Sequence, residues 1–367
     1  MNGSIILILI VTAVATSSLG VFLVLRKMSM LVDAISHTVL LGIVIAFIFV
    51  GDLSSPLLII GATVMGLLTI FLTETLIKSK KTAEDSATGL IFPLLFSIAV
   101  IIISTSFSGV HLDIDAVLLG KIEFAPFDKL FINQVSIGPK LFYIMLGVAL
   151  LNVIFIRLFF KELKIISFDS ALATAIGFLP AIIHYLLMFF VSLTAVTAFN
   201  AVGSILVIAL MIGPAASATM ITKDLKHTIL LAIGIGIINS IIGYWLALLF
   251  DTNISGMIAT ITLFVFLLVF IFEPHKGLVI TIVKRHILKK QFAFTILIFH
   301  LYNHPANEKE TKYNVIQKEL NWSPAKTTKQ IEKGIQKGYI KIENDFVLLT
   351  EQGTNYYNLL SKELSKT

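Results

Sequence analysis

The chain has 367 residues, of which 57% are hydrophobic and 14% are charged, and it contains no cysteine. A soluble domain cannot bury so much apolar surface, so the composition indicates a polytopic membrane protein. The lack of cysteine excludes disulfides, thiolate metal sites and thiol nucleophiles. The net charge is +6, but 15 Lys and Arg against 8 Asp and Glu follow from His275 onward, so the basic character belongs to the C-terminal tail.

Nine apolar segments reach or approach the roughly 20 residues that a spanning helix needs, and they predict an all-α membrane domain of about nine transmembrane helices. They lie at about 4–25, 30–50, 56–77, 87–106, 140–160, 178–199, 202–221, 228–250 and 255–273. Basic clusters follow the first, third, fifth, seventh and ninth segments. The positive-inside rule therefore predicts an outer N-terminus and a cytoplasmic C-terminus.

The second segment carries Asp33 and His37, which share one face of a helix because they are four residues apart. Counted along a helix from Arg26-Lys27, they would lie about 10 Å and 16 Å from the inner surface. An ionisable pair in hydrocarbon is costly and should face the protein interior or a water-filled path. One oxygen and one nitrogen suit a divalent transition metal, and a two-fold partner could supply a second pair. Alternatively, Asp33 pairs with a cation or caps the helix, and His37 makes a packing contact.

Other polar residues of the spans have simpler interpretations. We expect Glu74 to reach toward the lysines that follow its segment, and His184 to be a hydrogen-bonded packing residue. Asn152 is expected to bond between helices, and the small residues of 201–222 to allow close helix packing, although Pro214 there could also mark a gating hinge.

Two loops are informative. The outer loop 107–139 holds His111, Asp113, Asp115, Glu123 and Asp128, and it is either a solvated cap or a docking surface and entry funnel for cations. In the inner loop, Ser167 or Asp169 could cap a short helix that ends near Gly177, and Pro180 could open the next span. Such a helix is either an ordinary connector or a surface on which a partner ATPase could push.

Residues 274–290 are basic and amphipathic, which is typical of a linker helix at a membrane surface. Residues 291–367 predict a small α+β domain with the order helix, helix-turn-helix, hairpin and helix, which is that of a winged helix. Its third helix carries Lys326, Thr328 and Lys329, the residue types that contact DNA, although lysines on a solvated face are ordinary. The sequence has no phosphate-binding loop and no catalytic triad, so we expect a non-enzyme and no resident cofactor.

Several motifs now converge on a known family. Five segments occur in the order that is typical of this family. They are VLRKMSMLVDAISH (24–37), EDSATGLIF (84–92), DIDAVLLG (113–120), SFDSALATAIG (167–177) and AVGSILVIALMIGPAASA (201–218). The chain from about 15 to 273 resembles the membrane permease of metal-type ABC importers of bacterial plasma membranes. The tail, chiefly through IEKGIQKGYI (331–340) and LLTEQG (348–353), resembles the winged-helix domain of metalloregulators of the diphtheria-toxin-repressor kind.

The resemblance implies an ATP-driven importer of Mn²⁺, Zn²⁺ or Fe²⁺, with manganese favoured, that works as a homodimer with a separate ATPase and an extracytoplasmic metal-binding protein. It implies that Asp33 and His37 contact the transported ion. It also implies that Phe168, Asp169, Ala171 and Gly177 couple to the ATPase. The family usually has a proline where this chain has Leu41, so the helix is expected to be straighter there. A membrane-tethered, metal-responsive transcription regulator that binds DNA through the tail is the alternative.

Overall fold

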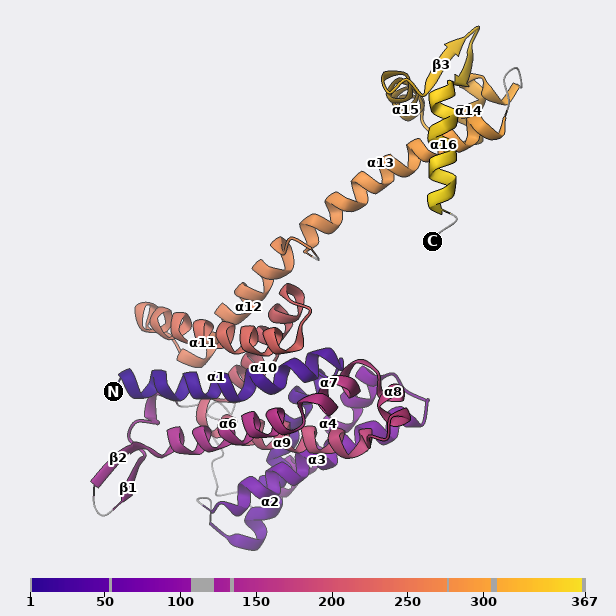
Figure 1. Ribbon diagram of the computed structural model, residues 1–367. Coiled ribbons are helices and arrows are strands. Elements are labelled where there is room, and N and C mark those ends of the chain that lie inside the picture. Colours follow the sequence, from indigo (N-terminus) through magenta and orange to yellow (C-terminus); the bar gives the residue numbers. More distant parts are fainter. Residues whose placement is uncertain are drawn as a thin grey trace. The chain divides into compact units, whose positions relative to one another are not determined.

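A computed structural model describes residues 2–52, 55–106, 122–132, 135–275, 277–304 and 309–364. The chain divides into two compact units, Met1–Gly277 and Leu278–Thr367. Figure 1 shows the first unit as a helical bundle, in which a small hairpin is the only sheet that the described residues form.

The first unit confirms the prediction of nine apolar segments, because its described residues form nine helices that are long and apolar enough to span a membrane. These helices are α1 (Asn2–Leu25), α2 (Met30–Val50), α3 (Leu57–Lys78), α4 (Glu84–Ser106), α6 (Lys140–Leu158), α9 (Pro180–Val202), α10 (Ser204–Ile221), α11 (Leu225–Phe250) and α12 (Ile254–Phe272). Each observed end lies within a few residues of the predicted one.

Helix α1 is the central element of this unit. It packs against α6, α9, α10 and α11, and it is the most buried of the nine spans. Figure 1 shows α1 running between α6 on one side and α10 and α11 on the other. Helices α4 and α12 are the most exposed spans, so they present the largest apolar faces to lipid or to another chain.

Small residues bring the backbones of these helices into contact. A Cβ atom added to Gly20 of α1 would overlap the carbonyl group of Met211 in α10, and one added to Gly42 of α2 would lie 2.5 Å from the carbonyl oxygen of Gly61 in α3. Close approach of this kind is a common way in which helices associate in lipid, where burial of apolar side chains gives little driving force.

Some buried polar groups of the spans form hydrogen bonds between helices. The amide Nδ2 of Asn152 in α6 donates to the Ala15 carbonyl in α1 at 3.1 Å and to Thr194 Oγ1 in α9 at 2.8 Å, which confirms its expected role. Thr69 of α3 donates to Thr38 of α2 at 2.8 Å. These bonds satisfy groups that hydrocarbon would leave without a partner.

The described part of the outer loop contains a short 3₁₀ helix η1 (Ile122–Phe124) and an antiparallel hairpin of β1 (Lys129–Ile132) and β2 (Val135–Pro139). Its Phe124, Phe127 and Phe131 side chains are exposed. His111, Asp113 and Asp115, together with the DIDAVLLG motif, lie outside the described residues.

The second unit has the predicted order of elements. It consists of α13 (Leu278–Asn303), a 3₁₀ helix η2 (Lys309–Thr311), α14 (Tyr313–Glu319), α15 (Pro324–Gln336), β3 (Ile340–Glu343), β4 (Phe346–Leu349) and α16 (Glu351–Leu364). Asn344 and Asp345 both have positive φ, the geometry of a tight hairpin turn, between the antiparallel strands. Ser323 is the N-cap residue of α15, and Pro324 is its first helical residue. Helix α13 runs without a break through residue 290, where the sequence suggested that a linker ends.

Replacement of Gly20 by alanine tests the close contact between α1 and α10. The added methyl group meets backbone that has no room to move aside, so we expect a loss of about 1–3 kcal/mol in the free energy of unfolding. Thermal unfolding of the detergent-solubilised protein measures the effect. Gly147→Ala in α6 is the matched control, since nothing lies within 4 Å of its added Cβ. Equal stability of the two variants would contradict the proposed packing.

Candidate functional site

Helix α2 positions both residues of the predicted metal pair. It begins only at Met30, which places Asp33 in its first turn, and residues 26–29 form a turn. The expected depths were counted along a helix from Arg26 onward, and that part of the prediction is wrong because the helix begins at Met30. Measured from the start of α2, Asp33 and His37 lie about 4.5 Å and 10.5 Å along the axis.

The pair has the spacing that a shared ion needs. His37 Nε2 lies 3.7 Å from Asp33 Oδ1, which is too long for a hydrogen bond. Because metal–ligand bonds are about 2.0–2.2 Å, two ligand atoms of one ion lie up to roughly 4.2 Å apart. The two side chains are 36% and 42% exposed in the single chain, so they are accessible to an ion or to another subunit.

Neighbouring residues orient the imidazole of His37. Its ring stacks on Phe92 of α4 with centroids 5.3 Å apart, and it lies edge-on to Phe96 at 5.9 Å. Leu41, one turn further on, is buried against Met65, Leu95 and Ala99, and α2 continues through it.

The pair does not by itself complete a metal site. Among the residues that the structure describes, no three His, Asp or Glu side chains form a group that could hold a metal ion. Divalent transition metals in proteins take four to six ligands. Asp33 and His37 can therefore contribute two ligands of an ion in transit.

The predicted short helix of the inner loop is present, and Asp169 is its cap. Helix α7 (Phe160–Phe168) is followed by α8 (Ser170–Ala175), and Asp169 Oδ1 accepts a hydrogen bond from the Leu172 amide at 2.9 Å. Ser167 is not the cap, because it lies in α7 and donates to the Leu163 carbonyl. Gly177 has a φ of +91° and ends this segment before Pro180 opens α9.

Apolar side chains stand exposed around α8. Phe168, Leu172, Ile176 and Leu179 are each more than half exposed, and Ala171 lies exposed beside them. A patch of this kind on a loop between spans is typical of a surface that another protein covers.

A polar network near the α8 segment was not predicted. His184 of α9 is hydrogen-bonded as expected, but its partners are Glu74 of α3 and Arg26 after α1. Glu74 also pairs with Lys78 at 3.5 Å, as expected. The sequence gives no signal for the other contacts, since 110 and 158 residues separate His184 from its two partners.

Two of the three predicted DNA-contacting residues of α15 make contacts within the tail. The Lys326 ammonium lies 4.4 Å from the centroid of the Trp322 ring. Thr328 Oγ1 and the Tyr313 hydroxyl are 2.6 Å apart. Lys329 is exposed. The α15 surface is therefore only partly available for phosphate contacts.

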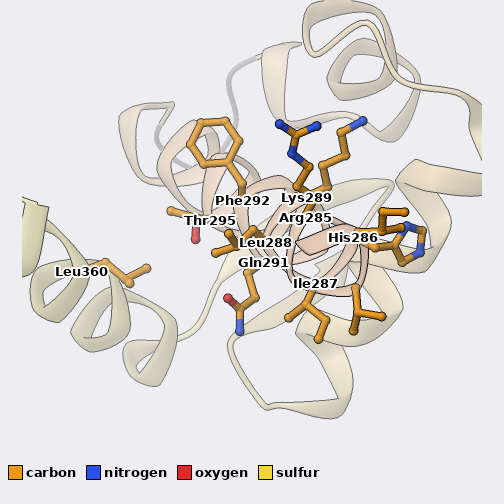
Figure 2. Close-up of a pocket in the computed structure, with 11 residues that line it drawn as sticks. Arg285, His286, Ile287, Leu288, Lys289, Gln291, Phe292, Thr295 and Leu360 are labelled. Carbon is orange, nitrogen blue, oxygen red and sulfur yellow. The ribbon is translucent and has the colours of Figure 1, made fainter. Parts of the chain in front are cut away.

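The tail also contains a cavity of about 1240 Å³ beside α13 and α16. Figure 2 shows Arg285 and Lys289 projecting from one side of α13, and Leu360 approaching from α16. Its other lining residues are mostly apolar, and none is a carboxylate. The cavity is therefore unsuited to a metal cation.

Comparisons with known proteins agree with this geometry. The sequence model described as the ABC 3 transport family matches residues 3–273. The manganese transport system membrane protein MntD of Bacillus subtilis (strain 168) is 42% identical over 74% of this chain and 91% of its own length. The zinc transport system membrane protein TroD of Treponema pallidum (strain Nichols) is 38% identical over 97% of both chains. The solved structure of PsaBC from Streptococcus pneumoniae in complex with Fab contains a similar chain, with a TM-score of 0.61 and 31% sequence identity. The match covers 73% of the present chain and 90% of the PsaBC chain.

Replacement of Asp169 by alanine tests the cap of α8. The Leu172 amide loses its acceptor, and we expect a local cost of about 0.5–2 kcal/mol. Hydrogen exchange of residues 170–175 should become correspondingly faster. Thr174→Ala removes a hydroxyl that bonds the Ser170 carbonyl and does not cap the N-terminus of α8, so it should change exchange little. Unaltered protection in Asp169→Ala would show that the segment is held in another way.

Proposed function

Because this chain belongs to the ABC 3 transport family, we propose that it is the membrane permease of an ATP-driven importer of divalent transition-metal ions. The relatives named for manganese and zinc transport support this function, as do the nine apolar helices. We favour Mn²⁺ over Zn²⁺ and Fe²⁺, since one carboxylate and one imidazole without a thiolate suit it.

The observation that carries the proposal is the geometry of Asp33 and His37 on α2, which we call the open pair because no hydrogen bond joins the two side chains. Asp33 and His37 point their ligand atoms toward each other at a distance that one ion can bridge, and no shorter hydrogen bond closes the pair. We propose that both contact the transported ion during alternating access. Two permease copies around a two-fold axis would bring two such pairs together and supply four protein ligands.

Partner proteins would act at opposite ends of the bundle. The segment Phe168–Gly177, with Asp169 as cap and Ala171 exposed, would receive a separate ABC ATPase on the cytoplasmic side. An extracytoplasmic metal-binding protein would dock on the outer loop, where Phe124, Phe127 and Phe131 are exposed. This arrangement places the C-terminus in the cytoplasm, because basic residues follow every second span.

The tail is proposed to be a winged-helix-like accessory module. The order of its helices and hairpin supports this assignment, and the alignment with TroD extends over it. The alignment with MntD spans 270 residues and 91% of the length of MntD, which is about the length of the first unit alone. A membrane-tethered regulator is less well supported, since the relatives are named as transport proteins and Lys326 and Thr328 are engaged within the tail.

Replacement of either Asp33 or His37 should slow metal uptake strongly. We expect Asp33→Asn and His37→Gln each to lower the initial rate of metal uptake by at least the roughly 10–100-fold that mutation of a residue supporting a metal ligand costs. Each variant replaces a carboxylate or an imidazole with a neutral amide, which binds a divalent transition-metal ion more weakly. Metal accumulated by proteoliposomes that contain the permease with its ATPase measures the rate. Co-purification of the ATPase shows that assembly is intact.

Ser36→Ala is the matched control for these variants, since its hydroxyl bonds only the Asp33 carbonyl among the described contacts. It should transport at close to the normal rate. Uptake at the normal rate by Asp33→Asn or His37→Gln would remove the pair from the ion pathway. Light scattering of the purified complex tests the homodimer, and a single permease copy or a pair formed with a second, related permease would contradict it.

Removal of residues 278–367 tests the tail. The family match ends at residue 273, and the compact first unit ends at Gly277. We therefore expect the shortened protein to import metal at a rate close to that of the full chain. A promoter-binding assay with the full chain and with Lys329→Ala tests DNA binding. Complete loss of uptake on deletion would assign the tail to the transport cycle.

A further inference from the structure

Five polar side chains of the first unit form one connected network, which we call the Arg26 network. It consists of Arg26 after α1, Glu74 of α3, Ser167 of α7, and His184 and Tyr185 of α9. All five line one cavity of about 600 Å³. The network therefore joins four segments that are far apart in the sequence.

Arg26 is the centre of this network. Its Nε donates to Ser167 Oγ at 3.2 Å, and its Nη1 contacts His184 Nδ1 at 3.3 Å. Burial lowers the pKa of Arg26 to about 10, so the guanidinium remains charged at neutral pH. Its planar fork allows it to hold two partners on different helices at once.

The chemistry of arginine fixes the protonation of His184. A guanidinium can only donate, so His184 Nδ1 must accept and the ring proton must lie on Nε2. That Nε2–H then donates to Glu74 Oε1, while the Tyr185 hydroxyl donates to Glu74 Oε2 at 3.1 Å. An imidazole with both nitrogens occupied in this way offers no lone pair to a metal. The Glu74–His184 pair is therefore not a second ion site in this arrangement.

The network is largely shielded from solvent. The side chains of Glu74 and His184 are only 14% and 17% exposed. Removal of one partner from a buried charged network is costly, because the remaining charge loses its compensation. We therefore expect the network to hold α3, α9 and the end of α7 together. If the network opens, its hydrogen bonds should be lost together and not one by one.

The network also connects two functional regions of the proposed permease. Ser167 immediately precedes Phe168, where the proposed ATPase-coupling segment begins, and Asp169, which caps α8. At the other end, α3 is bonded to α2 through Thr69 and Thr38, and Thr38 is the residue after His37. A continuous series of hydrogen-bonded and packed elements therefore runs from the coupling segment to the metal pair.

We propose that Arg26 is a positioning residue that transmits movement of the segment Phe168–Gly177 to α3 and α9, and through them to Asp33 and His37. This inference rests on the proposed function as an ATP-driven permease. Arg26 contacts neither the ion nor nucleotide in this role. In this role Arg26 couples ATP hydrolysis to metal import. A variant that lacks Arg26 should therefore still hydrolyse ATP but import less metal for each ATP.

The test compares transport with hydrolysis in the full chain, reconstituted with its ATPase and binding protein. Mn²⁺ accumulated and phosphate released are measured in the same proteoliposomes. We expect Arg26→Gln and His184→Gln to lower the metal imported per ATP by about ten-fold, in the range found for mutations in coupling networks. Binding of Mn²⁺ to the permease should be unchanged, because Asp33 and His37 are intact.

Two further variants separate positioning from charge. Lys27→Gln removes a neighbouring cation that is exposed and lines the same cavity, and it should keep the normal ratio of metal to ATP. Arg26→Lys keeps the charge but cannot hold Ser167 and His184 together, so it should remain poorly coupled. Full recovery by Arg26→Lys would show that only the charge matters and would overturn the proposal.

Ser167→Ala tests the same proposal if the Arg26 variants do not assemble with the ATPase. It removes only the hydroxyl that joins the coupling segment to Arg26, and we expect a smaller but measurable fall in metal imported per ATP. A normal ratio in Ser167→Ala, or in assembled Arg26→Gln, would refute the inference. Failure of the wild-type protein to import any metal would instead refute the proposed function, so the two failures are distinguishable.

Discussion

Hydrocarbon gives apolar helices little reason to associate with one another, so the membrane unit depends on direct contact between helix backbones. Gly20 of α1 and Gly42 of α2 lie against carbonyl groups of neighbouring helices, with no space for a side chain. These contacts place α1 at the centre and bring α2 close to α3. The position of Asp33 and His37 follows from this packing, because the main contacts of α2 within the described residues are with α3, α4 and α9.

Polar groups of the membrane unit differ in whether they are hydrogen-bonded to another helix. Asn152, Glu74 and His184 have hydrogen-bond partners on other helices, as buried polar groups in lipid require. The ligand atoms of Asp33 and His37, in contrast, are 3.7 Å apart and partly exposed. An ionisable pair that the fold leaves open is unusual within a spanning helix, and this contrast separates an ion-contacting role from a packing role better than the four-residue spacing does.

Much of the architecture could be predicted from the sequence, because hydropathy and loop charge report directly on spans. Asp169 and Pro180 similarly marked α8 and the start of α9 through local capping chemistry. The start of the helix that carries Asp33 was predicted wrongly in the count of depth, because hydropathy does not reveal that residues 26–29 form a turn. The partners of His184 could not be predicted, since single-sequence patterns carry no information about contacts across more than 100 residues.

The presence of Leu41 has a mechanical consequence for α2. A proline at this position would remove one backbone N–H and the helix hydrogen bond that it donates, and it would favour a kink in the helix. Leucine keeps that hydrogen bond, and the Leu41 side chain packs in a buried cluster with Met65, Leu95 and Ala99. We therefore expect the helix that carries Asp33 and His37 to move as one rigid body, without bending at Leu41.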